Sequence, residues 1–334
     1  MRTLVVCPGR GSYDRASLGS LAGRAAGLLD LCDGWRHAQG RPTVSELDAA
    51  DTYRATWHVA GEHASLLTAA CSWADWEELP DRHEIVGVVG NSMGFYTALA
   101  VAGALPLPDA VRLVDTMGAY QEGNVLGGQV LYPLAERDWR PDPARRAVVE
   151  AALGDDAWWS IDLGLYAVLG GTEAGLKRLG TTLPREERRG RVFPLRLPLH
   201  SAFHTPLMVE TSRRARAALA DLPFAAPRVP LIDGRGQVHR PRWADPAALG
   251  AYTLGHQVVA PFDFAIAVRA ALRHCAPEVV VALGPGNSLG APLAALLVQE
   301  GWQGVRTREA FEARQAEAPL LLSFGVPDQR ARLR

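Results

Sequence analysis

The sequence GNSMG at residues 90–94 has the pattern Gly-x-Ser-x-Gly. A valine-rich run, residues 84–89, precedes it, and an apolar, alanine-rich run, residues 95–102, follows it. The first run predicts a short buried strand and the second predicts the start of a helix. A serine at such a turn sits on a sharp bend with its hydroxyl exposed and the N–H groups of the helix start aimed at it. We therefore predict that Ser92 is a nucleophile. A tight structural turn is the alternative, and a base is needed to decide between them.

The composition is that of an ordinary globular chain. Its 334 residues are enough for one large domain or two smaller ones. Of these residues, 48% are hydrophobic and 21% are charged, which is ordinary for a globular protein. The 35 basic residues nearly cancel the 36 acidic ones, so no global attraction to nucleic acid or to a membrane surface is implied. No run approaches 18 uninterrupted apolar residues, so we expect no membrane span. The four cysteines form no C-x-x-C pair, which is typical of a reducing compartment, and we expect a cytoplasmic protein.

Three strand-then-glycine units predict the architecture of most of the chain. Residues 4–7, 85–89 and 278–283 are runs rich in β-branched residues, as in strands buried on both faces, and each leads into a loop that contains glycine. Helical patterns lie between them, at residues 17–31, 61–74, 109–121 and 262–272. This alternation predicts an α/β fold with a parallel sheet and a functional site at the carboxyl ends of its strands.

Residues 127–199 follow a different pattern. We predict strands at residues 128–134, 158–162, 166–169 and 191–197, and helices at residues 143–153 and 172–179. Their order, β-α-β-β-α-β, is ferredoxin-like, so this stretch is predicted to form a small inserted α+β subdomain. The C-terminal tail is expected to hold one helix, residues 309–318, and then a frayed basic end.

Two of the nine histidines lie close together, in the segment PLHSAFHTPLM at residues 198–208. This segment falls where the small subdomain returns to the rest of the chain, so a histidine here could face a cleft between the two parts. Any lone histidine is more often a surface residue or a satisfied core residue. The residues themselves do not choose between His200 and His204.

Ordered motifs, spread over nearly the whole chain, resemble those of the acyl-CoA:acyl-carrier-protein transacylases, the malonyltransferase family of fatty-acid and polyketide synthesis. PGRGS at residues 8–12 resembles the family's P-G-Q-G-S loop, and GNSMG resembles G-H-S-L-G. FHTPLM at residues 203–208 resembles F-H-S-P-L-M, which assigns the catalytic histidine to His204 and leaves His200 structural. Gln257 and GPGN at residues 284–287 resemble the two C-terminal signatures.

The resemblance implies a fold and a mechanism. The fold is a large α/β-hydrolase-like catalytic subdomain, residues 1–126 and 200–334, with a small ferredoxin-like subdomain at residues 127–199. Ser92 would attack an acyl thioester while His204 removes its proton. The oxyanion hole would be the backbone N–H groups of Arg10 and Met93. The backbone carbonyl of Gln257 would orient the histidine, in place of the acid of a Ser-His-Asp triad.

Several residues depart from the family's pattern. Met117 stands where malonyl-type members carry an arginine that pairs with the malonyl carboxylate, so we expect uncharged acyl groups to be preferred. The alternative is that Arg10, which replaces a glutamine, takes over the carboxylate. Phe95 replaces a glutamate and Asp162 replaces an asparagine, and both are interpreted as changed pocket positions. The expected acyl-pocket residues are Asn91, Met117 and Phe203.

On this resemblance we expect an acyltransferase that moves an uncharged acyl group between CoA or acyl-carrier-protein thioesters. Its partners would be an acyl carrier protein and an acyl-CoA or acyl-pantetheine thioester, with no nucleic acid and no membrane. An acyl hydrolase that removes acyl groups from the carrier proteins of a polyketide assembly line is the alternative, and a non-catalytic docking module is a third. No metal or organic cofactor is expected, because the phosphopantetheine arm is part of the substrate. Candidates for docking acidic carrier helices are Arg185, Arg188, Arg189 and Arg191.

Overall fold

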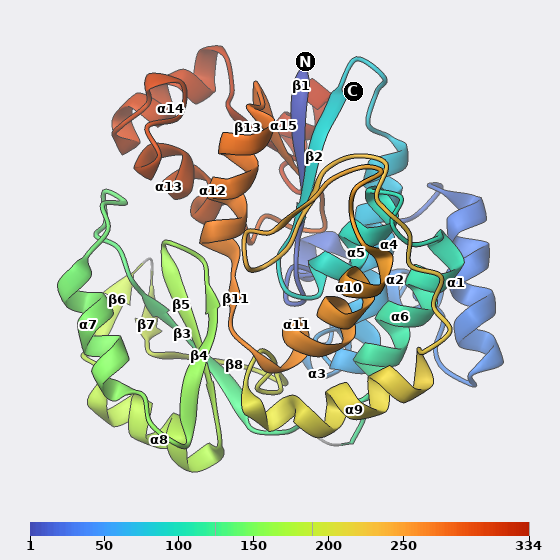
Figure 1. The fold of residues 1–334 in the computed structure, drawn as a ribbon, viewed down its shortest axis with the longest axis horizontal. Coiled ribbons are helices and arrows are strands. Elements are labelled where there is room, and N and C mark those ends of the chain that lie inside the picture. The colour runs from blue at the N-terminus through green and yellow to red at the C-terminus, as the bar shows by residue number, and fades with distance from the viewer. Residues whose placement is uncertain (124, 189, 334) are drawn as a thin grey trace.

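The computed structural model describes residues 1–123, 125–188 and 190–333 (Figure 1). Its larger sheet has six strands in the order β10-β9-β2-β1-β12-β13. These strands are β1 (Arg2–Cys7), β2 (Glu84–Gly90), β9 (Leu231–Ile232), β10 (Val238–His239), β12 (Val279–Ala282) and β13 (Leu321–Ser323). All neighbours pair in parallel except β9 and β10. The three predicted strand-then-glycine units are therefore adjacent strands, β2, β1 and β12, at the centre of one sheet.

Helices cover both faces of this sheet (Figure 1). On one side lie α4 (Gly61–Glu77), α5 (Gly94–Val101) and α6 (Leu107–Ala119), and on the other lie α12 (Phe264–Cys275) and α13 (Gly290–Gln299). The remaining helices of this part of the chain are α1 (Ala26–Ala38), α2 (Val44–Asp48), α3 (Ala55–His58), α9 (Val209–Ala218), α10 (Pro246–Ala251), α11 (Gln257–Val259), α14 (Arg308–Glu317) and α15 (Pro327–Leu333). Short 3-10 turns occur at Arg15–Ser17, Pro206–Met208 and Trp302–Gly304, and a π-helical turn at Tyr252–His256.

Residues 128–197 build a second sheet, ordered β11-β4-β5-β3-β8. Its strands are β3 (Gly128–Pro133), β4 (Ala157–Asp162), β5 (Tyr166–Gly171) and β8 (Leu195–Leu197), and its helices are α7 (Pro143–Ala152) and α8 (Glu173–Thr182). The pairs β4–β5, β5–β3 and β3–β8 are antiparallel, which is the predicted ferredoxin-like arrangement. A separate apolar core lies between this sheet and its two helices. Strand β11 (Phe262–Asp263) comes from outside residues 127–199 and pairs with β4.

Two predictions about single elements are wrong. The helix predicted at residues 17–31 does not form as one element, because Gly19 and Gly23 adopt left-handed backbone angles, φ 77° and 71°, and α1 begins only at Ala26. The strand predicted at residues 191–197 is divided between β7 (Arg191–Phe193) and β8. Pro194 separates them, because it has no N–H to donate to a ladder. Strand β7 instead forms a hairpin with β6 (Glu186–Arg188).

The C-terminal end also differs from the prediction of a frayed tail. Helix α15 covers residues 327–333, and Leu333 is fully buried. Arg330 pairs with Asp75 at 3.0 Å and with Glu78 at 2.9 Å, which holds the helix against α4. Among the described residues, no helix is both long enough and apolar enough to cross a membrane.

Candidate active site

The GNSMG turn connects the end of β2 to the start of α5, as the sequence predicts. Ser92 has φ 56°, a left-handed angle that non-glycine residues adopt at a cost of roughly 1–2 kcal/mol. A Cβ atom on Gly90 would lie 2.2 Å from the Gly94 carbonyl carbon, and one on Gly94 would lie 2.3 Å from the Cys7 carbonyl oxygen. The bend therefore needs glycine at both positions, and it presents the Ser92 side chain at the carboxyl ends of β1 and β2.

His204 lies next to the serine. Its Nε2 atom is 2.7 Å from Ser92 Oγ, and its Nδ1 atom is 2.5 Å from the backbone carbonyl oxygen of Gln257. Because a carbonyl only accepts, Nδ1 carries the proton and donates it, which leaves Nε2 free to accept the Ser92 hydroxyl. The His204 backbone also has a left-handed φ, 63°, and its N–H donates to the Val258 carbonyl at 2.9 Å.

Burial keeps the imidazole of His204 neutral. The ring is almost fully enclosed, and this desolvation lowers its pKa from 6.5 to about 4, although the Gln257 carbonyl acts in the opposite direction. At neutral pH the side chain is therefore the uncharged acceptor that a general base must be.

The side chain of Gln257 contacts the backbone of Ser92 and the side chain of Tyr96. Its Nε2 donates to the Ser92 carbonyl at 2.9 Å, and its Oε1 accepts the Tyr96 hydroxyl at 2.6 Å. Gln257 and Tyr96 are both buried. One residue thus contacts the histidine through its backbone and the serine through its amide. The sequence motifs marked only the backbone contact.

The two backbone N–H groups expected to bind an oxyanion belong to Arg10, in the loop after β1, and Met93, at the start of α5. Among the described residues, neither N–H donates to a protein acceptor. Both residues line the same cavity as Ser92. Their N–H groups are therefore free for a ligand, which an oxyanion hole requires.

A cavity of about 820 Å³ holds all of these groups. The eight predicted site residues that line it are Arg10, Asn91, Ser92, Met93, Met117, Phe203, His204 and Gln257. The two other interpreted pocket positions do not line it. Phe95 is fully buried and packs edge-on against the Tyr252 ring, with centroids 5.2 Å apart. Asp162 pairs with Arg146 and accepts the Gly164 N–H, so both changes affect packing away from the cavity and the interpretation is wrong for them.

Sequence reasoning missed several residues that line the cavity. His200, predicted to be structural only, is one of them, and its Nδ1 is 2.8 Å from the Pro198 carbonyl oxygen. Burial, followed by the charge of Arg10, lowers the pKa of His200 to about 3, so it is neutral. Gln129 supports the histidine loop by donating to Ser160 Oγ at 2.8 Å and to the Phe203 carbonyl at 3.4 Å. No motif marks these residues, because they come together only in the fold.

The side chain of Arg10 is enclosed on the cavity wall beside Gln121 and α4. Its Nη1 atom is buried and has no hydrogen-bond partner among the described residues. Desolvation lowers the pKa of Arg10 to about 10, with Glu62 acting in the opposite direction, so the guanidinium remains charged at neutral pH. The cavity therefore contains a cation as well as the neutral thioether of Met117.

Comparison with known proteins gives relatives of two kinds, malonyl transacylases and polyketide synthases. No family model matches the chain. It is 26% identical over 239 residues to the malonyl CoA-acyl carrier protein transacylase of Salmonella typhimurium, which covers 68% of this chain and 72% of that protein. It is 30% identical over 206 residues to polyketide synthase GfsB of Streptomyces halstedii, which covers 61% of this chain but only 4% of the synthase.

Solved structures agree with these relatives. The malonyl-CoA:acyl carrier protein transacylase of Xanthomonas oryzae superposes with a TM-score of 0.76 at 21% identity, over 99% of this chain and 98% of that one. A malonyl-transacylase solved in complex with a type II PKS acyl-carrier protein superposes with a TM-score of 0.72 at 20% identity, over 89% and 93%. The predicted fold class is confirmed. So is the resemblance to the malonyl-CoA:acyl-carrier-protein transacylases.

Proposed function

We propose that this protein is an acyl-carrier-protein acyltransferase that works through an acyl ester on Ser92. The observation that carries the proposal is the chain of contacts from Ser92 Oγ to His204 Nε2, 2.7 Å, and from His204 Nδ1 to the Gln257 carbonyl, 2.5 Å, inside the cavity. The relatives of this chain, transacylases and polyketide synthases, support the same reaction class. The structure solved with a carrier protein supports an acyl carrier protein as the partner.

In the first half-reaction, His204 Nε2 takes the proton of Ser92 Oγ as this oxygen attacks the thioester carbonyl carbon. The carbonyl oxygen gains negative charge and accepts hydrogen bonds from the N–H groups of Arg10 and Met93. A donor of this kind accelerates acyl transfer by roughly 10²- to 10³-fold. The intermediate then collapses, the C–S bond breaks, and the leaving thiolate takes the proton from His204. The products are an acyl-serine ester and a free thiol.

In the second half-reaction, the thiol of a second phosphopantetheine arm gives its proton to His204 and attacks the ester. The intermediate then collapses: the bond between the acyl carbon and Ser92 Oγ breaks, and Ser92 Oγ takes the proton back from His204. Water in place of the thiol would make the same site an acyl hydrolase. The lifetime of the ester in water therefore separates the two activities.

The finer part of the proposal concerns the acyl group. Met117 lines the cavity, is 3% exposed and cannot pair with a carboxylate, so uncharged acyl groups are expected to load faster than malonyl. Arg10 is the group that could reverse this preference, because it brings an unpaired guanidinium N–H into the same cavity. If Arg10 held the malonyl carboxylate, the wild-type protein would load malonyl faster than acetyl, and Arg10→Met would lose that advantage.

The test of the proposal is the mass of the intact protein after mixing with acetyl-pantetheine. We expect a mass increase of one acyl group, located on the peptide that contains Ser92. Ser92→Ala should show no increase, and His204→Ala should form the adduct at least 100-fold more slowly. An adduct that forms equally fast on Ser92→Ala contradicts the proposal.

A further inference from the structure

A smaller hollow of about 220 Å³ adjoins the cavity, and three arginines line it: Arg137, Arg188 and Arg308. We call it the arginine crevice. It shares Tyr166, Arg188 and Ala291 with the walls of the larger cavity, so the two hollows are neighbours. In Figure 1 the loop between β3 and α7 rises from the small subdomain toward α13 and α14. Arg137 belongs to this loop and Arg308 begins α14.

Arg188 provides the most direct indication that the crevice suits an anion. Its side chain is only 8% exposed, and its Nε donates to Glu186 at 2.5 Å. Its Nη2 atom is buried and has no hydrogen-bond partner within the described part of the chain. A buried donor without an acceptor costs about 1–3 kcal/mol, and more when it carries charge. An anion in the crevice would remove that cost.

The position of Arg188 also changes the interpretation of the arginine-rich hairpin that β6 and β7 form. The sequence suggested Arg188 as a surface cation for docking a carrier protein, together with Arg185 and Arg191. The last two are exposed, but Arg188 is turned inward between two hollows. Arg189, the fourth candidate, lies outside the described residues.

The two other arginines are held at the edge of the crevice by contacts that use only part of each guanidinium group. Arg137 Nη2 donates to the Glu187 carbonyl at 3.1 Å, and Arg308 Nη1 donates to the Arg137 carbonyl at 3.3 Å. The Arg308 guanidinium lies 5.1 Å from the centroid of the Trp139 ring, which fixes its plane. Each guanidinium has five N–H donors, so both have donors left for a ligand.

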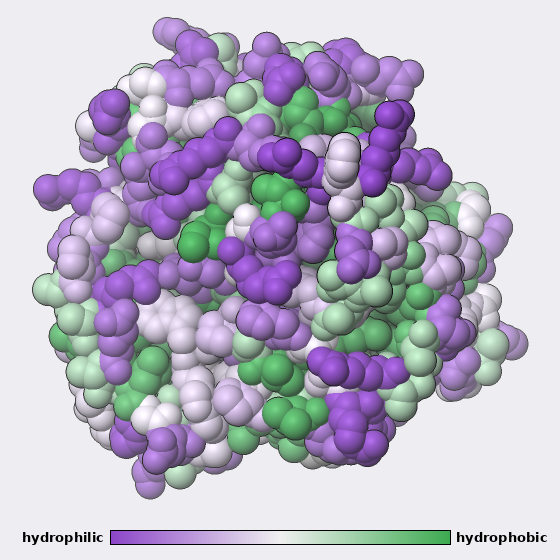
Figure 2. Space-filling view, viewed as in Figure 1, coloured by the Kyte–Doolittle hydropathy of each residue, from purple (hydrophilic) through white to green (hydrophobic). Residues whose placement is uncertain are grey.

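The charges around the crevice favour an anion. The only carboxylate among the described residues that line it is Glu136, against three guanidinium groups. Two of these guanidinium groups also pair with an acid outside the lining: Glu186, which Arg145 shares, pairs with Arg188, and Glu312 pairs with Arg308 along α14. Both pairs use the Nε atom of the arginine. Figure 2 shows hydrophilic residues gathered across the face between the small subdomain and α12 to α14. A guanidinium group can donate to two oxygens of one phosphate at once, so three arginines around one hollow suit a phosphate.

We propose that the arginine crevice binds a phosphate of the arm that carries the acyl group. This inference rests on the proposed function, which supplies a pantetheine thioester in the neighbouring cavity. The phosphate could be the one that joins pantetheine to a carrier protein or to the nucleotide of CoA, or it could be the 3′-phosphate of CoA. The chemistry is the same in each case, a phosphate ester held by Arg137, Arg188 and Arg308.

The experiment compares acetyl thioesters that differ only in phosphate. Ser92 loading is measured with acetyl-pantetheine, acetyl-4′-phosphopantetheine, acetyl-dephospho-CoA and acetyl-CoA. We expect the phosphorylated thioesters to have at least a 10-fold higher kcat/KM than acetyl-pantetheine, through a lower KM. Arg137→Gln and Arg308→Gln should each lose most of this advantage while loading acetyl-pantetheine at the wild-type rate.

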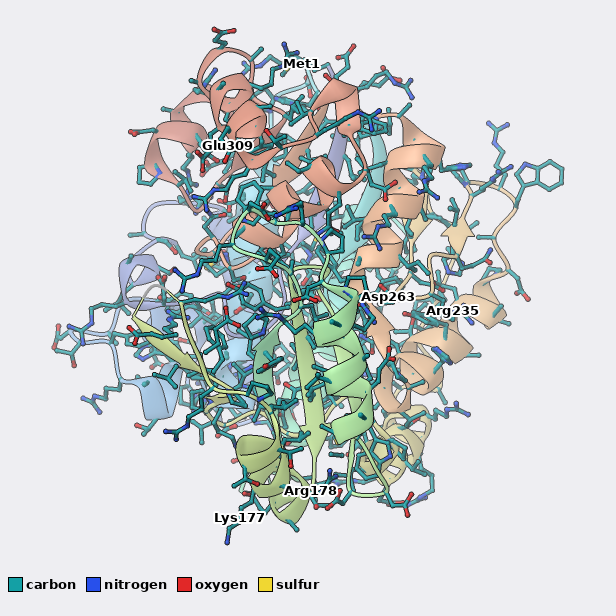
Figure 3. All side chains as sticks on the ribbon, turned by 90° about the vertical axis from the view of Figure 1, so that its left-hand side faces the viewer. Met1, Lys177, Arg178, Arg235, Asp263 and Glu309 are labelled. Atoms are coloured by element: carbon teal, nitrogen blue, oxygen red, sulfur yellow. The ribbon has the colours of Figure 1, made fainter. Side chains whose placement is uncertain are left out.

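The matched control is Lys177→Gln. Lys177 is an exposed cation on α8, and Figure 3 shows it at the end of the small subdomain far from Glu309 on α14. Removing this charge should leave the phosphate advantage intact. An advantage that first appears with acetyl-CoA identifies the 3′-phosphate, and one present with phosphopantetheine identifies the phosphate of the arm.

Equal kcat/KM for all four thioesters overturns the inference, and so does an advantage that survives in the Arg137→Gln, Arg308→Gln double variant. Failure of every thioester to load Ser92 instead contradicts the proposed function. The crevice is then tested without catalysis, by titrating phosphopantetheine and pantetheine into the Ser92→Ala protein. At least 10-fold tighter binding of phosphopantetheine, lost in the double variant, supports the crevice, and equal binding overturns it.

Discussion

Replacing Tyr96 with phenylalanine tests whether the side chain of Gln257 holds the catalytic pair in place. The Tyr96 hydroxyl donates to Gln257 Oε1 at 2.6 Å, and the other end of the same amide donates to the Ser92 carbonyl at 2.9 Å. Ser92 and His204 both have left-handed backbone angles, so neither conformation is maintained by local preference. The contacts of Gln257 are therefore expected to restrain both residues.

The magnitude follows from the burial of the contact. Phenylalanine keeps the ring, and hence the cavity wall, but leaves Gln257 Oε1 without its donor in a buried place. An unsatisfied buried acceptor costs about 1–3 kcal/mol, which should appear as a lower free energy of unfolding. Without this donor, the amide of Gln257 holds Ser92 less firmly. If the activation free energy of acylation rises by about 1–2 kcal/mol because the catalytic pair is less well oriented, Ser92 acylation slows by about 5- to 30-fold.

Stopped-flow acylation with saturating acetyl-pantetheine and urea unfolding measure the two effects separately. Tyr132→Phe is the matched control, because Tyr132 is also buried and its hydroxyl donates to the Pro184 carbonyl at 3.1 Å in the small subdomain. It should lose stability without losing rate. If Tyr96→Phe loses stability but acylates within twofold of the wild-type rate, the amide does not position the pair and the reasoning is refuted.

Four further predictions concern the site. Because burial lowers the pKa of His204 to about 4, the rate of acylation should stay constant from pH 8 to about pH 5 and halve near pH 4. A pH–rate profile that falls near pH 6.5 would contradict this. Protonation of His204 also favours the unfolded chain, so urea unfolding should show its contribution to stability intact above pH 6.5 and falling from there through pH 4. Met117→Arg should raise malonyl loading relative to acetyl by at least 10-fold, measured as adduct mass with equal concentrations of both thioesters, and an unchanged ratio would remove Met117 from the account of specificity. Gly90→Ala should lower the free energy of unfolding by more than about 3 kcal/mol, since its Cβ would lie 2.2 Å from the Gly94 backbone, whereas Gly180→Ala on an open part of α8 should not.

The sequence predicted those parts of the fold whose signals are local. The valine-rich strands and the glycines beside Ser92 identify the centre of the sheet and the sharp turn, because burial on both faces and a left-handed bend each restrict residue type at neighbouring positions. The same kind of local signal was present at Gly19 and Gly23, and giving it more weight would have avoided the helix predicted at residues 17–31. The choice of His204 over His200 needed the family resemblance, since spacing alone left both open.

The rest of the site depends on contacts between distant segments. Arg308 and Arg137 are 171 residues apart and share one hydrogen bond, and no pattern in either segment indicates that they meet. Strand β11 pairs with β4 through two residues, which is too short for any periodicity to predict. Phe95 shows the converse error. It follows the nucleophile turn directly, but the rotation of α5 turns its side chain into the core rather than toward the cavity.

The most direct test of the central claim is the fate of the acyl group after it reaches Ser92. Protein loaded with a single acyl group is divided between buffer and a solution of holo acyl carrier protein, and the intact masses of both proteins are followed with time. A transferase predicts an adduct that persists in buffer and moves to the carrier at least 100-fold faster than it hydrolyses. An adduct that decays in buffer as fast as it does with carrier contradicts the account and makes the protein an acyl hydrolase.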